Sequence, residues 1–439
     1  MAQGNNYIAA IDLGTTKVVT LVGKPTQSGK FEIVGFSSAE STGIKKGMIQ
    51  NIEETVKSIQ KTVDDVKART GIDFKSVYVG IAGQHIRSIK HNGYRLIEND
   101  ETEISQSDIE ALTNEMHRIP VDAGETILHV LPLEYLIDNE LIDNNKPVGM
   151  IGRKIEANFH IVIGKTASAK HVEKCINRAG LNVAELVLEP IASAEAVLTK
   201  DEREAGVALI DIGGGTTDLA VFYEGNIRHT AVIPLGGDII TQDIKQGCSI
   251  LLKQANALKE RYGSALSDIA PDNKIITIPG ISGREHKEIS MKSLAGIIQA
   301  RMQDILDFIL YEISLSGYSD KLSAGIVITG GGALLKNLPQ LIKFHTGYDV
   351  RVGLPTENLS TESLEEYSLP QYSTGIGLAL LGMENAQKSP LTDNAEFTDV
   401  KQDEKQEVLE TTGKKSSFKS FGNFKNILSN LFDESDTEM

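Results

Sequence analysis

Hydrophobic and polar positions follow two different periods along residues 1–385. Short apolar runs bounded by glycine or polar turns predict β-strands, and longer stretches with apolar residues three or four apart predict α-helices. The strands are expected at residues 7–12, 17–23, 31–36, 76–81, 127–131, 158–163, 206–211, 217–223 and 325–329. The helices are expected at residues 51–69, 105–117, 168–179, 190–199, 238–261, 291–316 and 373–384. This order predicts an α/β protein whose helices cover its sheets.

Two strand-and-turn segments resemble one another and lie about 200 residues apart. The first runs from Tyr7 to Thr16 and the second from Gly206 to Thr217. In each, an apolar strand ends in an aspartate and is followed by a turn of small residues and a second apolar strand. The repeat predicts a duplicated domain with a cleft between its halves.

The turns after these strands have the chemistry of phosphate-binding loops. Glycine lets main-chain N–H groups approach a phosphate, and threonine hydroxyls add donors. The carboxylates of Asp12 and Asp211 suit a hydrated Mg²⁺ ion held through water, and Lys17 can reach a terminal phosphate. One such turn alone is an ordinary hairpin feature, but two at matching offsets favour a nucleotide site. The residues expected to bind phosphate are Asp12, Gly14, Thr15, Thr16, Lys17, Asp211, Gly213, Gly214, Gly215, Thr216 and Thr217.

A third glycine-rich turn, consisting of Gly330, Gly331 and Gly332, follows an apolar strand. It leaves room for a flat adenosine against the main chain. Its glycines lack the spacing of the dinucleotide-binding fingerprint, and the chain contains no P-loop sequence.

Length, charge and cysteine content limit the classes of protein to which the chain could belong. A chain of 439 residues is long enough for two to four domains. Its net charge of −16 argues against nucleic acid as a partner. Cys175 and Cys248 have neither metal-site spacing nor a disulfide framework around them. We expect neither a signal peptide nor a transmembrane helix.

The three motifs resemble those of a known superfamily. Asp-Leu-Gly-Thr-Thr at 12–16, Asp-Ile-Gly-Gly-Gly-Thr-Thr-Asp at 211–218 and Thr-Gly-Gly-Gly-Ala at 329–333 are similar to the two phosphate motifs and the adenosine motif of actin, Hsp70 and the sugar kinases. The resemblance implies duplicated ribonuclease H-like domains around a cleft that binds ATP and Mg²⁺. It also implies connecting helices that start near Pro190 and Ser373, and another nucleotide-facing turn at Gly236 and Gly237. By the same analogy Glu189 is a candidate for placing an attacking water, although Glu-Pro is also a common helix start.

Four further stretches resemble the FtsA family of bacterial cell-division proteins: residues 129–132, 147–153, 156–162 and 188–198. That resemblance implies an inserted α+β subdomain, polymerisation, binding of the tubulin-like protein FtsZ and recruitment of later division proteins. It divides the chain into subdomain 1A (1–87 and 166–200), the inserted subdomain 1C (88–165), subdomain 2A (201–249 and 304–385), subdomain 2B (250–303), an acidic disordered linker (386–413) and a helix (414–433). His129 and His160 fall in the inserted subdomain, where we expect packing or a hydrogen bond within the subdomain.

The last segment has the pattern of a helix that lies on a membrane surface. Its apolar residues share one half of a helical wheel, its lysines precede any acid, and an acidic linker separates it from the globular part. The residues expected to contact an anionic membrane are Lys414, Lys415, Phe418, Lys419, Phe421, Phe424, Lys425, Ile427, Leu428, Leu431 and Phe432. They predict a peripheral protein on the cytoplasmic face of the membrane at the division site. Docking of this helix on the globular part or on a partner remains the alternative.

Three other functions fit parts of the sequence. A sugar or acetate kinase of the same superfamily needs an acceptor pocket and a base, and such a kinase usually lacks a basic amphipathic tail. An Hsp70-like chaperone needs a peptide-binding domain after residue 385, where about 50 linker-like residues remain. A pilus-assembly relative shares the inserted subdomain but not the tail. The sequence leaves open whether ATP is hydrolysed and which residues bind FtsZ.

Overall fold

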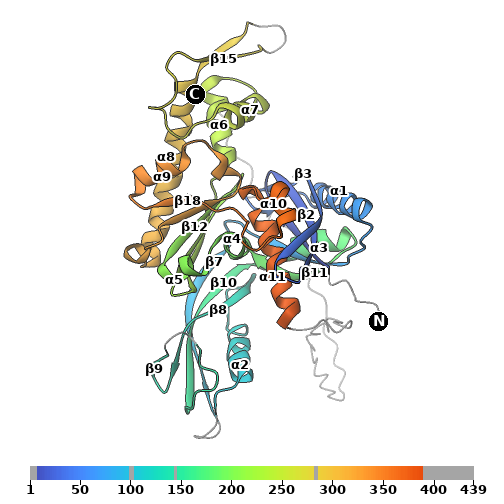
Figure 1. The fold of residues 1–439 in the computed structure, drawn as a ribbon, viewed down its shortest axis with the longest axis vertical. Helices are drawn as coiled ribbons and strands as arrows, with labels where there is room; N and C mark the ends of the chain where they lie inside the picture. The colour runs from blue at the N-terminus through green and yellow to red at the C-terminus, as the bar shows by residue number, and fades with distance from the viewer. Residues whose placement is uncertain (1–6, 98–102, 143–145, 281–284, 389–439) are drawn as a thin grey trace, which may run out of the picture. The chain divides into compact units, whose positions relative to one another are not determined.

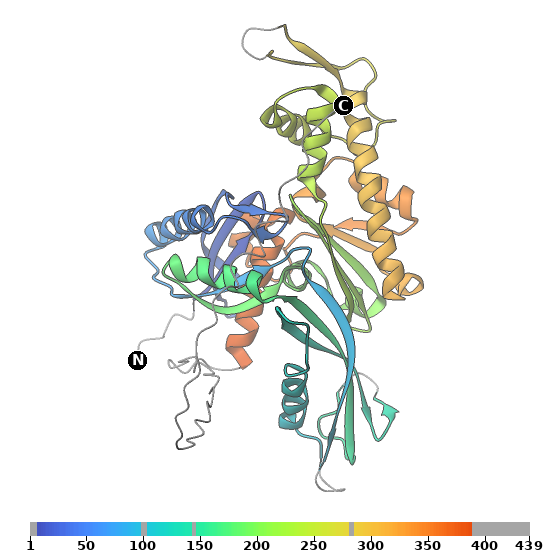
Figure 2. The same cartoon turned by 180° about the vertical axis from the view of Figure 1, so that it is seen from behind.

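The computed structural model describes residues 7–97, 103–142, 146–280 and 285–388, which Figures 1 and 2 show from opposite sides. The first half contains β1 (Ile8–Leu13), β2 (Lys17–Pro25), β3 (Phe31–Glu40), β4 (Ile44–Lys45), β5 (Met48–Ile49), α1 (Ile52–Thr70), β6 (Ser76–Ile81), α3 (Thr166–Arg178), β11 (Asn182–Leu188) and α4 (Glu189–Val197). Between β6 and α3 the chain forms β7 (Arg87–Leu96), α2 (Gln106–Met116), β8 (Glu125–Ile137), β9 (Glu140–Leu141) and β10 (Lys154–Lys165).

The second half begins with α5 (Lys200–Ala205), β12 (Val207–Ile212), β13 (Thr217–Tyr223), β14 (Asn226–Ile233), α6 (Gly237–Cys248), α7 (Leu252–Tyr262), β15 (Ile275–Ile278) and β16 (Lys287–Ser290). It continues with α8 (Met291–Ser316), β17 (Ile326–Thr329), α9 (Leu338–Thr346), β18 (Val350–Val352), α10 (Thr361–Tyr367) and α11 (Ser373–Lys388).

The two halves repeat one sheet topology. The first sheet has the order β3-β2-β1-β6-β11 and the second has the order β14-β13-β12-β17-β18. In both sheets the first three strands along the chain form an antiparallel meander, and a strand parallel to the central one follows. The central strands β1 and β12 are buried along their whole length, which explains their continuous apolar sequences. The predicted duplication is therefore confirmed.

Helices cover both faces of each sheet. In the second half α6, α8 and α9 share a hydrophobic core with one face of the sheet, and Figure 2 shows α8 in gold along it. In the first half α1 and α3 cover the corresponding face. The remaining faces of both sheets share one core with α4 and α11. These two helices approach closely, because a Cβ atom added at Gly377 would overlap the carbonyl oxygen of Ala192.

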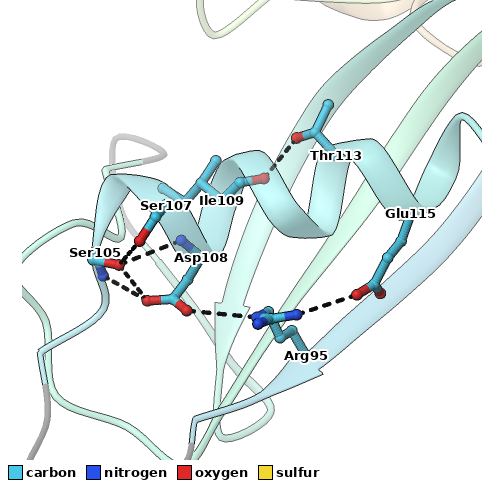
Figure 3. Close-up of polar contacts among 7 residues, drawn as sticks. All are labelled: Arg95, Ser105, Ser107, Asp108, Ile109, Thr113 and Glu115. Atoms are coloured by element: carbon cyan, nitrogen blue, oxygen red, sulfur yellow. Dashed lines mark hydrogen bonds and ion pairs between the residues drawn. The ribbon is translucent and has the colours of Figure 1, made fainter.

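The segment between β6 and α3 forms a separate sheet with the order β7-β10-β8-β9. The helix α2 packs on this sheet (Figures 1 and 3) and encloses a core around Phe159 and Leu112. Ser105 and Asp108 form a capping box at the start of α2, a sequence signal that stabilises helix starts. Arg95 of β7 lies 3.5 Å from Asp108 and 3.2 Å from Glu115, and so ties the helix to the edge strand.

One long element differs from its prediction. The single helix expected at 238–261 is wrong, because α6 ends at Cys248 and α7 begins at Leu252. Ser249 between them adopts the left-handed conformation, with φ of 49°. Ile250 and Ala255 belong to the same core, so the hydrophobic pattern continues through the break and does not reveal it.

The residues predicted to contact a membrane, from Lys414 to Phe432, lie outside the described part of the chain, as does the predicted linker beyond Lys388. Among the helices that are described, none has both the length and the apolar character needed to cross a bilayer.

Candidate functional site

The two predicted phosphate loops face each other. The first, Gly14–Thr16, joins β1 to β2, and the second, Gly213–Thr216, joins β12 to β13. A Cβ atom added at Gly214 would overlap the side chain of Thr16, and one added at Gly215 would lie 2.5 Å from Oγ1 of Thr15. Both positions therefore require glycine. The fold brings together the loops that the sequence places about 200 residues apart.

Gly236 and Gly237 lie against the second phosphate loop at the start of α6. The main-chain N–H of Gly237 donates to the carbonyl oxygen of Gly213 at 2.9 Å, and that of Asp238 donates to Gly214 at 2.8 Å. The Lys259 ammonium of α7 donates to the carbonyl oxygen of Gly237 at 2.8 Å. These bonds hold the turn against the second phosphate loop. The sequence offered no signal for Lys259, because it belongs to an ordinary polar helix face.

The predicted adenosine turn packs on the end of β12. Gly330 has a φ of +82°, which favours glycine, and a Cβ atom there would overlap Oδ1 of Asp211. A Cβ atom at Gly332 would overlap the side chain of Ile212. A Cβ atom at Gly331, by contrast, would meet no atom within 4 Å. The turn thus adjoins the second phosphate loop and keeps space at its middle residue.

The threonines of the second loop use their hydroxyls inside the protein. Thr217 donates to the carbonyl oxygen of Leu235 at 2.8 Å, and Thr216 donates to Oδ2 of Asp218 at 3.1 Å. In this structure their hydroxyl hydrogens therefore stabilise the loop. Binding by this loop would rest mainly on its main-chain N–H groups.

Four carboxyl groups gather beside one ammonium group. Burial raises the pKa of Asp12 to about 7 against the opposing effect of Lys17, with a smaller increase from Asp211. Burial, followed by Asp211, raises the pKa of Asp218 to about 8. Burial also raises the pKa of Glu189 well above its usual value, with Asp12 contributing next. The cluster therefore has fewer cations than carboxyl groups. Buried charged groups need partners of opposite charge, so a further cation would stabilise the ionised carboxylates.

Lys17 is the cation of this cluster. Burial lowers its pKa, while Asp12 and Asp211 oppose that change. Its Nζ lies 4.8 Å from the ring centroid of Tyr372, so an aromatic face also contacts it. Glu189 lies against Gly80 at the end of β6, where an added Cβ atom would be 3.1 Å from its Cγ.

Asp211 is held by hydroxyls from both connecting helices. Ser193 of α4 donates to its Oδ2 at 2.6 Å, and Thr374 of α11 donates to the same atom at 3.1 Å. These bonds lower its pKa, although burial dominates and raises it. Sequence reasoning assigned no role to Ser193, Thr374 or Asp218, although Asp218 closes the second phosphate motif.

The chemistry of this site suits a nucleotide with a hydrated cation. The buried Oδ1 of Asp218 has no hydrogen-bond partner among the described residues, which is the environment that a cation or its water would complete. No group of three or more His, Cys, Asp or Glu side chains in the described ranges is arranged to hold a metal directly. An Mg²⁺ ion that keeps several waters and takes few protein ligands fits this donor set.

Comparisons with known proteins agree with this architecture. The family model described as "Cell division protein FtsA" matches residues 208–377, and the model described as "SHS2 domain inserted in FTSA" matches residues 83–163. The chain is 39% identical to the cell division protein FtsA of Pseudomonas aeruginosa over 383 residues, covering 87% of this chain and 90% of that protein. It is 35% identical over 395 residues to that of Escherichia coli K12, covering 88% and 92% of the two chains. It is 32% identical over 386 residues to that of Bacillus subtilis 168, covering 88% and 85%.

Two solved structures share the fold. A chain of the "PilM-PilN type IV pilus biogenesis complex" matches with a TM-score of 0.62 and 16% identity, covering 86% of this chain and 98% of that chain. MreB5 of Spiroplasma citri bound to ADP matches with a TM-score of 0.53 and 15% identity, covering 87% and 99%. At these identities the likeness concerns the fold alone. The predicted fold class, duplicated actin-like domains with an inserted subdomain, is confirmed.

Proposed function

The chain belongs to the FtsA family of cell division proteins, and from this membership we propose that it is an ATP-dependent polymer that tethers the FtsZ ring to the membrane. Its location would be the cytoplasmic face of the cell membrane at the division site. Its partners would be FtsZ, further copies of itself, an anionic membrane surface and later division proteins. The phosphotransferase alternative is not favoured, because the relatives matched over most of the chain are cell division proteins.

The facing glycine loops are the observation that carries the ATP-binding part of the proposal. Glycines at 214 and 215 let the two loops pack closely against each other, and a loop without Cβ atoms lets main-chain N–H groups approach phosphate oxygens. Lys17 would neutralise part of the phosphate charge. The adenosine would lie at Gly330–Gly332, beside the second loop. The ADP in the MreB5 structure belongs to that protein, and it supports ATP here by analogy of fold.

The carboxyl groups would have two different roles, cation binding and placement of a water. Asp12 and Asp211 would hold Mg²⁺ through water, and Mg²⁺ would supply charge neutralisation for the phosphates when bound. Glu189 would orient a water near the terminal phosphate, because it belongs to the same buried carboxyl cluster as Asp12 at the first phosphate loop. Nucleotide binding would mainly switch the relative position of the two halves and favour polymer contacts.

The tail would supply the membrane contact. Each of its four lysines is worth about 1 kcal/mol near an anionic leaflet. Partial burial of several Phe and Leu side chains adds a few kcal/mol at ~25 cal/mol per Å², and ordering of the helix opposes both contributions. A single tail would therefore bind weakly, whereas a polymer that presents many tails would bind firmly through avidity.

The test is co-sedimentation with vesicles that contain anionic lipid, with and without the ATP analogue AMPPNP and Mg²⁺. The intact chain is compared with a truncation after Thr412, with Phe421→Ser/Phe424→Ser on the apolar face, and with Ser429→Ala on the polar face as a matched control. We expect the intact chain and the control to pellet, more so with nucleotide, and the truncation and the double variant to stay in solution. Equal pelleting of all variants would contradict the role of the tail. Failure of the intact chain to bind AMPPNP in a calorimetric titration would contradict the ATP site.

A further inference from the structure

His129 of the inserted subdomain contacts the end of strand β11, which leads into Glu189. His129 lies on β8, and its ring Nε2 accepts a hydrogen bond of 2.9 Å from the main-chain N–H of Leu188. Leu188 is the last residue of β11 and the residue before Glu189, which begins α4. The bond therefore fixes the Val187–Leu188 peptide group, one residue before Glu189. It joins two subdomains, which differs from the contact within the subdomain that the sequence led us to expect.

The bond requires a neutral histidine. An acceptor Nε2 carries no proton, so the proton of the neutral ring is on Nδ1. Burial, with a smaller contribution from His117, lowers the pKa of His129 to about 4. The ring is thus neutral at physiological pH, and the hydrogen bond persists there.

The Leu188 N–H has few other ways to be satisfied. Leu188 is the N-cap residue of α4, and no capping box supplies a side-chain acceptor to its N–H. Leu188 itself is fully buried, so water does not replace a lost partner easily. An apolar side chain at position 129 would fill the space but leave this N–H unpaired. A purely packing role for His129 does not explain why its nitrogen faces that group.

The same small sheet also contacts the second half. His160 of β10 lies 3.0 Å from the hydroxyl of Thr230 on β14, through its Nε2. The Arg228 guanidinium of β14 donates to the carbonyl oxygen of Leu133 on β8 at 3.4 Å. The sheet of the inserted subdomain is therefore hydrogen-bonded to both halves of the duplicated fold.

We propose that His129 is a positioning residue for Glu189, through which the inserted subdomain controls nucleotide turnover. The proposal rests on the proposed ATP-binding function. His129 holds the Val187–Leu188 peptide next to Glu189, and His160 and Arg228 bind the same sheet to the half that carries the second phosphate loop. A force on the inserted subdomain, such as a contact with another chain, reaches the start of α4 through this bond. Hydrolysis thereby responds to whether the inserted subdomain is engaged.

The variants separate positioning from packing. His129→Leu removes the acceptor and keeps an apolar side chain, whereas His129→Gln offers an amide oxygen as a substitute acceptor. His171→Leu changes an exposed histidine of α3 and is the matched control. The first readout is hydrogen–deuterium exchange of the peptide that covers residues 186–192, in the absence of nucleotide. We expect exchange to accelerate roughly three- to tenfold in His129→Leu, the loss of one hydrogen bond, and to return toward the wild-type rate in His129→Gln.

The second readout compares ATP affinity with the single-turnover hydrolysis rate in the full-length chain. We expect His129→Leu to keep its affinity within about twofold while hydrolysis falls roughly tenfold, with partial rescue in His129→Gln. Affinity that falls in step with hydrolysis, or wild-type rates in His129→Leu, would overturn the proposal. A wild-type chain that binds ATP but does not hydrolyse it would also overturn it. A wild-type chain that binds no ATP would instead overturn the proposed function, while the exchange measurement would still test the His129 contact.

Discussion

Replacing Asp218 by asparagine is expected to stabilise the protein in the absence of nucleotide. Asp218 faces Asp211 across the β12–β13 pair and is only 3% exposed. Its Oδ2 accepts a hydrogen bond from Thr216, and its Oδ1 has no partner among the described residues. The asparagine side chain would keep an acceptor for Thr216 and remove the group that resists ionisation. The substitution therefore isolates the electrostatic contribution from the packing contribution.

The magnitude follows from the pKa of Asp218, which burial raises from 3.8 to about 8. Well below pH 3.8 the carboxyl group is protonated in both the folded and the unfolded chain, so burial of charge has no effect on stability. As pH rises toward 8, the unfolded chain ionises more readily, and folding is penalised by about 1.4 kcal/mol per pH unit. At pH 8 this gives an upper bound of about 6 kcal/mol. Because Asp211 and Asp12 share the effect, we expect a measured gain of about 1–3 kcal/mol.

Thermal unfolding of the nucleotide-free protein at pH 5 and pH 8 measures this gain. We expect Asp218→Asn to raise Tm at pH 8 by about 2–6 °C and to lose at least half of that increase at pH 5. Asp73→Asn is the control, because Asp73 is exposed and lies 2.6 Å from Lys67, which lowers its pKa. It should give no increase at pH 8. A lower Tm for Asp218→Asn at pH 8, or an equal gain at both pH values, would contradict an electrostatic penalty at Asp218.

Two further substitutions test the loops and their support. Gly214→Ala should weaken AMPPNP binding at least tenfold in a calorimetric titration, because its Cβ atom would overlap Thr16. The control Gly296→Ala, where a Cβ atom meets nothing within 4 Å, should bind normally. Equal affinities would exclude a tight fit between the loops. Ser193→Ala removes the 2.6 Å hydrogen bond to Asp211. It should weaken Mg²⁺-dependent nucleotide binding by about 1.5–3 kcal/mol, while binding measured in EDTA changes little. An equal loss in both conditions would contradict a role through Asp211.

Regular elements with strong hydrophobic patterns were predictable from the sequence. The helix at 291–316 and the strands at 76–81 and 217–223 have the bounds that their patterns predict. The edge strand β7 was missed, because seven of its ten residues are polar or glycine and its pattern of burial is irregular. Its strand conformation comes from ten consecutive pairs with β10. Pairing of that kind is a tertiary effect, which local sequence does not encode.

The glycine loops of the site were predictable for a related reason, since each is a local motif that follows a buried strand. The residues that support them were not. The hydroxyls of Ser193 and Thr374 lie 3.0 Å apart in space, yet the two residues are 181 positions apart in the chain. His129 and Leu188 are 59 positions apart and belong to different subdomains. Neither pair has a sequence pattern of its own, because the duplicated fold and the inserted sheet create the contacts.

The duplication also shows how the two halves came to differ in charge. Both hairpins place four residues between paired strand ends, with Leu13 opposite Val18 and Ile212 opposite Thr217. By this register Lys17 occupies the position that Thr216 holds in the second half, and Val19 occupies the position of Asp218. The first hairpin thus carries an ammonium group and no second carboxyl group, whereas the second hairpin carries a second carboxyl group and no ammonium group. We therefore expect the terminal phosphate to lie toward Lys17 and the hydrated cation toward the second hairpin, where Asp211 and Asp218 are both buried.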